Sequence, residues 1–283
     1  MKKQHLLILL GIILVSTIFF FGRTTSTKKE NSNIEKPKEN IQLFDIDHFT
    51  TTEKAKLTPE KAIILSKLEN GITRGDILSE KIKANELLAN FWKDSAKSFE
   101  LYAFYTSATS KLVNSEKNLT FAARIFLDNL REEKDISKLN WETDQAIDLF
   151  ERAIKINPSN DDLKVGLGSC YVFGKGQDGN ANETMKGILQ LKAIVDRDST
   201  NMKAQLVLGI GGLKSGQFEK AIIRFEKVVT AEPYNVEAVT FLADAYGAIG
   251  KKADAIKYYF ISKKLINNPE YSKEVDEHIK QLK

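Results

Sequence analysis

One spacing of side chains recurs along this chain and constrains its fold more than any single residue does. Two copies share intervals of +4, +7 and +12: Ala146, Phe150, Ala153 and Pro158, and then Ala221, Phe225, Val228 and Pro233. Looser copies begin at Gly187 and Ala255. An internal repeat with helical spacing predicts a stack of similar helical units, so the expected fold class is all-α.

The copies fall into repeat units that follow one another without gaps. The predicted units are 116–160, 161–201, 202–235 and 236–269, preceded by a degenerate unit at 82–115. The last two units have 34 residues each, and the extra residues of the two earlier units lie between their helices. The Thr58-Pro59 pair predicts a helix start, so N-terminal helices are expected over 58–115. Pro269 can open a final helix with Asn268 as its N-cap, and a capping helix is expected at 270–283.

Three stretches carry a pattern known from other proteins: LGIGGLKSGQFEKAIIRFEKVVTAEP (208–233), LADAYGAIGKKADAIKYY (242–259) and QAIDLFERAIKINP (145–158). They resemble the tetratricopeptide repeat (TPR) family. The resemblance implies a right-handed solenoid of antiparallel helix pairs over 116–269, whose concave face binds proteins or peptides. Gly212 departs from the family pattern, which has an aromatic residue there, and Asn267 stands where a proline is usual.

The N-terminal residues have the pattern of a signal anchor. Lys2 and Lys3 precede an uncharged run over 6–22, which at ~1.5 Å per residue only just spans a bilayer core of ~30 Å. No small-x-small cleavage site follows this run, so a transmembrane signal anchor at 1–22 is favoured over a cleaved signal peptide or a buried soluble helix. The polar composition that follows predicts a flexible linker over 23–57.

The charges that flank the apolar run predict which side of the membrane the repeats face. Lys2 and Lys3 favour an N-terminus inside, although Arg23, Lys28 and Lys29 on the other flank compete. We therefore expect a single-pass protein of the inner (cytoplasmic) membrane with a periplasmic, extracytoplasmic repeat domain. The layout also resembles envelope TPR proteins of Bacteroidetes-type bacteria, which implies a cell-envelope location.

Charge and reactive residue types argue against several classes of function. The 42 basic residues face 38 acidic ones, which does not favour a nucleic-acid binder. The three histidines, His5, His48 and His278, are far apart, and Cys170 has no histidine or aspartate partner nearby in sequence. The stretch 178–183 begins like a calcium loop but lacks the required glycine. We therefore expect no catalytic residue, no cofactor, no metal site and no enzyme activity.

The family register assigns a concave groove to the first helix of each unit. The groove positions implied by the resemblance are Val165, Ser169, Val172, Phe173, Lys203, Leu206, Ile210, Leu213, Lys214, Thr240 and Asp244. A carboxylate clamp needs lysine and asparagine where this chain has Leu206 and Ile210, so the expected ligand is an apolar segment flanked by charge. The alternative is that Leu206, Ile210 and Phe173 pack against the long loops or the N-terminal helices.

These features predict a membrane-tethered adaptor that binds an apolar peptide segment or a protein partner on its concave face. Two other functions stay open. One is a repeat scaffold of an envelope enzyme or accessory subunit, with reactive side chains in 72–140. The other is a self-assembling structural protein, in which the C-terminal helix pairs copies into a homo-oligomer.

Overall fold

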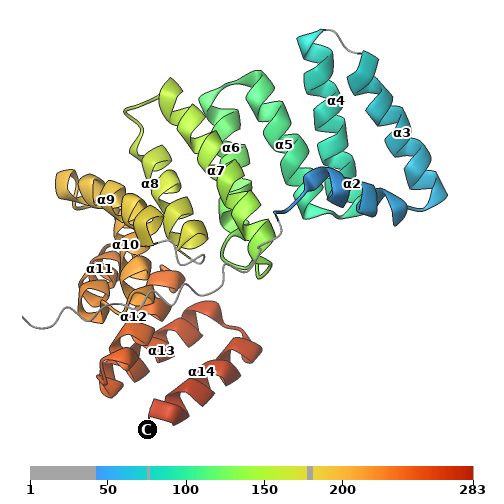
Figure 1. Ribbon diagram of the computed structural model, residues 1–283. Helices are drawn as coiled ribbons and strands as arrows, with labels where there is room; N and C mark the ends of the chain where they lie inside the picture. The colour runs from blue at the N-terminus through green and yellow to red at the C-terminus, as the bar shows by residue number, and fades with distance from the viewer. Residues whose placement is uncertain (1–42, 75–76, 177–180, 283) are drawn as a thin grey trace, which may run out of the picture. The chain divides into compact units, whose positions relative to one another are not determined.

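The computed structural model describes residues 43–74, 77–176 and 181–282, and these residues form helices and their connections without any strand. The chain divides into two compact units, Met1–Ile41 and Gln42–Lys283, and the first of them lies outside the described residues. The elements, with two π-helical segments labelled η, are α2 (Ile46–Ala55), α3 (Pro59–Arg74), α4 (Leu78–Asn90), η1 (Phe91–Ala96), α5 (Phe99–Val113), α6 (Glu116–Asn129), α7 (Ile136–Ile156), α8 (Asp161–Cys170), η2 (Tyr171–Lys175), α9 (Ala181–Arg197), α10 (Met202–Lys214), α11 (Phe218–Ala231), α12 (Val236–Ala248), α13 (Lys252–Ile266) and α14 (Pro269–Leu282) (Figure 1).

Helices that are neighbours in sequence pack as hairpins (Figure 1). The pairs are α4 with α5, α6 with α7, α8 with α9, α10 with α11, and α12 with α13. Each hairpin then contacts the next one, for example through α7 and α8 or through α11 and α12. A single hairpin cannot bury its apolar face alone, so stacking on its neighbours is what stabilises it. The all-α fold with paired helices agrees with the expectation from the sequence.

One buried aromatic side chain recurs at the eleventh position of the predicted units. These residues are Trp92, Phe126, Tyr171 and Tyr246, each at most 7% exposed. The ring of Tyr246 stacks on Tyr258 of α13, and its hydroxyl donates a hydrogen bond to Glu226 of α11. The aromatic residue therefore joins the second helices of two successive units. The unit 202–235 is the exception, because its eleventh residue is Gly212.

A helix forms where the sequence predicted a linker. Asp45 caps α2 by accepting two backbone N–H hydrogen bonds at 2.9 and 3.1 Å. The apolar face of this helix, with Ile46 and Phe49, packs against the N-terminal hydrophobic cluster. The prediction of a flexible linker over 23–57 is therefore wrong for the α2 residues, because their apolar side chains are spaced along one face of a helix and pack on that cluster. Residues 23–42 lie outside the described part of the chain.

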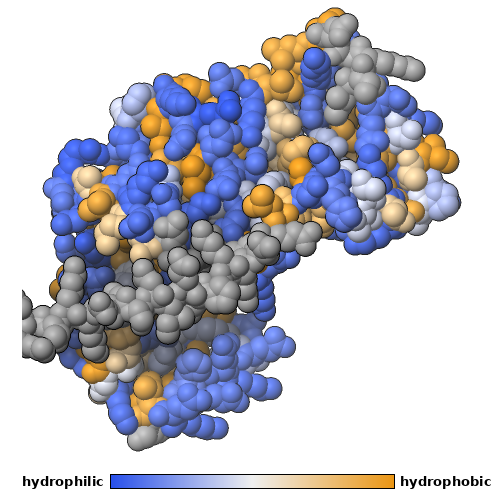
Figure 2. Space-filling model, in the orientation of Figure 1, coloured by the Kyte–Doolittle hydropathy of each residue, from blue (hydrophilic) through white to orange (hydrophobic). Residues whose placement is uncertain are grey.

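The C-terminal helix α14 packs on the last hairpin. Its N-cap is Asn268, as the sequence predicted, and the Asn268 side chain accepts two backbone N–H hydrogen bonds at 2.8 and 3.1 Å. Val275 and Ile279 are at most 4% exposed and belong to the main hydrophobic core. The helix begins at Pro269, one residue before the predicted range 270–283. On the face drawn in Figure 2, the surface over α14 is mainly hydrophilic.

The signal anchor predicted at 1–22 lies outside the described residues. Among the helices that the structure describes, none is both long and apolar enough to cross a bilayer. The anchor and its orientation thus remain predictions from the sequence.

Candidate functional site

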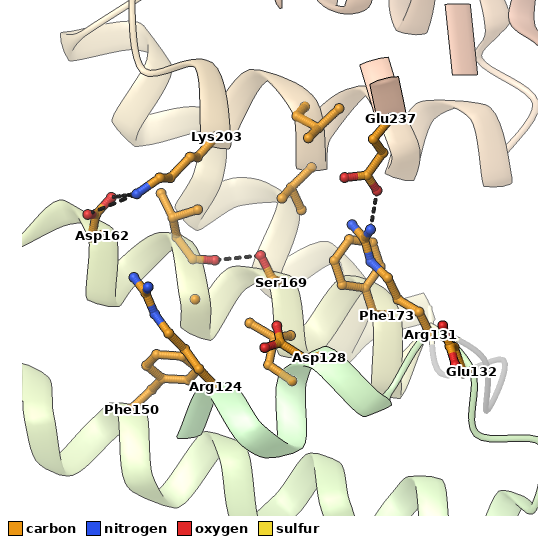
Figure 3. Close-up of a pocket in the computed structure, with 15 residues that line it drawn as sticks. Arg124, Asp128, Arg131, Glu132, Phe150, Asp162, Ser169, Phe173, Lys203 and Glu237 are labelled. Carbon is orange, nitrogen blue, oxygen red and sulfur yellow. Dashed lines mark hydrogen bonds and ion pairs between the residues drawn. The ribbon is translucent and has the colours of Figure 1, made fainter. Parts of the chain in front are cut away.

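A cavity of about 530 Å³ opens on the helices that begin successive units, α6, α8, α10 and α12 (Figure 3). We call this cavity the groove. Its apolar floor consists of Leu127, Phe150, Val165, Phe173, Leu206 and Val207. Its rim carries charges of both signs, from Arg124, Asp128, Arg131, Glu132, Asp162, Lys203 and Glu237. Four predicted units therefore contribute side chains to one site.

Five of the predicted groove residues line this cavity: Val165, Ser169, Phe173, Lys203 and Leu206. Leu206 is partly exposed, whereas Val165 and Phe173 are 5% and 3% exposed. The hydroxyl of Ser169 donates to the backbone carbonyl of Val165 at 2.8 Å, so it is satisfied within its own helix. The accessible apolar surface of the floor is thus small, and Leu127 and Leu206 provide most of it.

Two other predicted groove residues, Val172 and Ile210, lie in the hydrophobic core. They are 1% and 3% exposed. Both belong to the main core cluster, where Gly211 permits close packing: a β-carbon there would lie 2.8 Å from Cδ1 of Ile188 and 3.6 Å from Cγ1 of Val172. Without that β-carbon, α9 and η2 approach α10 closely. The expectation that Ile210 faces a ligand is therefore wrong, and this residue packs against neighbouring elements instead.

The remaining predicted positions fall outside the cavity: Leu213, Lys214, Thr240 and Asp244. The hydroxyl of Thr240 lies 3.2 Å from the hydroxyl of Tyr271 on α14, and Asp244 accepts a hydrogen bond from Tyr259 at 2.6 Å. Burial raises the pKa of the Asp244 carboxyl. Thr240, a predicted groove position of the last unit, is therefore occupied by its contact with α14, and the groove does not extend along α12 to Thr240 or Asp244.

Arg131 crosses the groove and was not among the predicted residues. It follows α6 in the connection 130–135, which is short because most of the extra residues of the unit 116–160 lengthen α7, which has 21 residues, and do not lie between the helices as predicted. The guanidinium of Arg131 forms an ion pair with Glu237 of α12 (Figure 3). The same guanidinium lies 4.1 Å from the centre of the Phe173 ring, close enough for a cation–π contact. The register assigns groove positions to first helices alone, so it misses a side chain that reaches in from a loop.

Some of the rim charges are paired and others are not. Lys203 and Asp162 form an ion pair at 3.1 Å between α10 and α8. Arg124, Asp128 and Glu132 form no ion pair with any described residue, although they face the same cavity. A ligand can therefore find both an open cation and open carboxylates at the rim.

The arrangement suits noncovalent binding. The only cysteine, Cys170, is fully buried, and burial raises the pKa of its thiol, which disfavours the reactive thiolate. Within the described ranges, no three His, Cys, Asp or Glu side chains are grouped so that they could hold a metal ion. His48 and the neighbouring Asp45 belong to the capped start of α2. The first three residues of the calcium-like stretch 178–183 lie outside the described part of the chain.

No family model matches this sequence, and no curated protein sequence matches it. Solved structures show weak similarity. MamA is 16% identical over 66% of this chain and 92% of its own, with a TM-score of 0.44. YrrB, described as a TPR protein with an unusual peptide-binding site, is 15% identical over 74% and 97%, with a TM-score of 0.43.

A third solved structure is PilW, described as a widely conserved type IV pilus biogenesis factor. It is 19% identical over 71% of this chain and 92% of its own, with a TM-score of 0.45. The repeat architecture of this chain is seen in its own stacked helix pairs.

Proposed function

We propose that this chain is a membrane-tethered adaptor whose groove holds a peptide segment of a partner protein. The observation that carries the proposal is the groove itself, a cavity of about 530 Å³ shared by α6, α8, α10 and α12. Its volume lies within the range of roughly 300–1,000 Å³ that is typical of ligand sites. A site that runs across successive stacked units suits an extended segment or a helix.

The floor and the rim define the chemistry of that segment. Leu127 and Leu206 offer a small apolar surface, which fits one or two aliphatic or aromatic side chains. Arg124 can pair with a carboxylate of the segment, while Asp128 and Glu132 can pair with a lysine or an arginine. The ligand is therefore a short apolar anchor with flanking charges of both signs.

Site-specific photo-crosslinking in cells tests this assignment. A photoreactive amino acid replaces Leu206 in the full-length chain, and in the matched control it replaces Ile223, which is 56% exposed on α11. We expect a protein adduct at position 206 and none at 223, with the partner identified by mass spectrometry. Equal adducts at both positions, or none at 206, would contradict the proposal.

The membrane tether is the second part of the proposal. The uncharged run over 6–22 supports an anchor, and α2 leaves residues 23–42 as the connection to the repeats. Random-coil scaling gives a connection of this length a typical span of about 25 Å. Such a tether raises the local concentration of a partner at the membrane surface.

A reporter enzyme fused to the C-terminus tests the tether and its orientation. We expect alkaline phosphatase to be active in this fusion, since that enzyme needs an oxidising compartment. The fusion should also stay in the membrane pellet after carbonate extraction. An inactive phosphatase with an active cytoplasmic reporter at the same position would overturn the orientation, and release by carbonate would overturn the anchor.

The packing of α14 weighs against self-assembly through the C-terminal helix. Val275 and Ile279, on its apolar face, are already buried against the same chain. A second copy could reach them only after α14 had left its own hairpin. A scaffold role for an enzyme subunit, in contrast, is a form of partner binding, and the crosslinked partner would identify it.

A further inference from the structure

One unit of the stack lacks the aromatic side chain that the others bury at their eleventh position. In the unit 202–235 this residue is Gly212 of α10. A cavity of about 550 Å³ lies beside it and is lined by Gly211 and Gly212. A β-carbon at position 212 would lie 3.4 Å from Cβ of Ala221, an ordinary contact, so the backbone there leaves room for a side chain. The missing ring has left its space open, and we call this cavity the Gly212 pocket.

The walls of the Gly212 pocket come from the second helices of two successive units. These are α9 and α11, the counterparts of the helices that Tyr246 joins in the next unit. Met185, Ile188 and Leu208 provide the apolar lining, and Met185 is 53% exposed. Large apolar side chains around an open space are typical of a site that receives a further apolar group.

The polar lining of the Gly212 pocket is positively charged. Lys192, Lys220 and Arg224 line it, and among the residues that the structure describes no carboxylate does. Lys220 donates to the side-chain oxygen of Gln217 at 2.9 Å, and Arg224 donates to that of Gln205 at 2.7 Å. These partners are neutral, and none of the three cations forms an ion pair with a described residue.

One carboxylate acts on this cluster from outside the pocket. Asp196 on α9 interacts electrostatically with Arg224, but it does not belong to the lining. Lys192 and Lys220 are left without a carboxylate partner among the described residues. The pocket thus combines an empty aromatic position with cations that an acidic ligand can neutralise.

We propose that the Gly212 pocket binds an aromatic side chain of a partner protein that is flanked by acidic residues. The ring enters the position that the chain's own aromatic residue fills in the other units, and it packs on Met185, Ile188 and Leu208. The flanking carboxylates pair with Lys192, Lys220 and Arg224 at the rim.

The chain's own N-terminal segment does not have this chemistry. Residues 23–40 contain five basic and three acidic residues and no aromatic residue. The Gly212 pocket also shares no lining residue with the groove. The inference therefore does not depend on the proposed function, and the two can fail separately.

Fluorescence anisotropy with a defined probe tests the inference on the purified full-length chain. The probe is a labelled nine-residue peptide with a central phenylalanine flanked by glutamates. We expect saturable binding, and we expect a loss of at least about tenfold in affinity when the phenylalanine is changed to alanine or the glutamates to lysines. Absence of binding, or equal binding of all three peptides, overturns the inference.

Two variants of one residue locate the probe. Gly212→Tyr restores the ring of the other units, so it should fill the pocket and weaken binding by at least about tenfold. Gly212→Ala adds a single carbon and should bind as the unchanged chain does. Leu206→Glu, in the groove, should also leave probe binding unchanged. Loss of binding in Leu206→Glu with full binding in Gly212→Tyr would place the peptide in the groove and overturn the inference.

A further variant decides the matter if Gly212→Tyr does not fold. Lys220 is exposed, and Lys220→Glu reverses one charge at the rim without touching the core. Its expected effect is a loss of about tenfold in affinity for the acidic probe. Unchanged binding overturns the inference. Decanoate, which joins an aliphatic chain to a single carboxylate, serves as a non-aromatic competitor. If it binds more tightly than the peptide, the assignment of the ligand as an aromatic side chain is overturned.

Discussion

Two glycines three residues apart on α10 have opposite roles at the scale of single residues. A β-carbon at Gly209 would lie 2.5 Å from Cε1 of Phe225, inside the packed hairpin. A β-carbon at Gly212 would meet only Ala221 and a backbone oxygen at ordinary distances. Gly209 therefore permits close approach of two helices, whereas Gly212 leaves a space.

This contrast predicts opposite effects of the same substitution. We expect Gly209→Ala to lower the free energy of unfolding by about 1–3 kcal/mol, because the Phe225 ring must move out of its packed position. Gly212→Ala should raise it by up to about 1 kcal/mol, because alanine favours a helix interior over glycine. Urea unfolding followed by circular dichroism measures both. Equal effects of the two substitutions would contradict the packing described for α10.

A buried carboxyl predicts how stability depends on pH. Glu142 is 0% exposed and accepts hydrogen bonds from the Asn129 side chain at 3.0 Å. Burial raises the pKa of Glu142 to about 7, against the hydrogen bonds from Asn129, which lower it. In the pH range between its unfolded and folded pKa values the folded state holds more protons, so the free energy of unfolding falls as pH rises through that range.

The variant Glu142→Gln tests this pH dependence. It keeps one acceptor oxygen for the Asn129 amide and removes the titration. Between about pH 5 and about pH 8, the free energy of unfolding of the unchanged chain should fall by roughly 1–3 kcal/mol relative to the variant. Parallel pH profiles of the two proteins would show that Glu142 is not the group responsible.

At the scale of elements, helix pairing was predictable and some helix ends were not. The small and large residues at fixed spacing predicted the hairpins, and Asn268 with Pro269 predicted the start of α14. The helix α2 was missed because its sequence, IDHFTTTEKA, has few apolar residues. Its stability comes from the surface that Ile46 and Phe49 meet, which belongs to distant helices and is not visible in the local sequence.

The docking of α14 predicts a local effect of one core substitution. Ile279 is 4% exposed in the contact of α14 with the last hairpin. We expect Ile279→Ala to speed amide hydrogen exchange in α14 and to leave α6 and α7 unchanged, because α14 packs on the last hairpin and the stability of a stack is mainly a property of each unit and its contacts with the next. The exposed neighbour variant Lys280→Ala should change neither region. A rise in exchange throughout the chain would contradict this independence.

At the scale of the whole described domain, the site was predictable only in part. The family register placed Leu206 and Lys203 in a groove, and both line the cavity. It also placed Ile210 there, although that residue is 3% exposed and packs in the main hydrophobic core. It could not find Arg131, because a loop of irregular length has no register and its partner Glu237 is 106 residues away.

The groove on α6, α8, α10 and α12 is proposed to hold the partner, and the affinity of the full-length chain for the partner that crosslinks at position 206 tests this when it is compared between two variants. Leu206→Glu puts a charge on the groove floor, and Ile223→Glu puts the same charge on an exposed apolar position outside it. We expect Leu206→Glu to weaken binding by at least about tenfold and Ile223→Glu to leave it unchanged. Equal affinities of the two variants would show that the groove does not hold the partner.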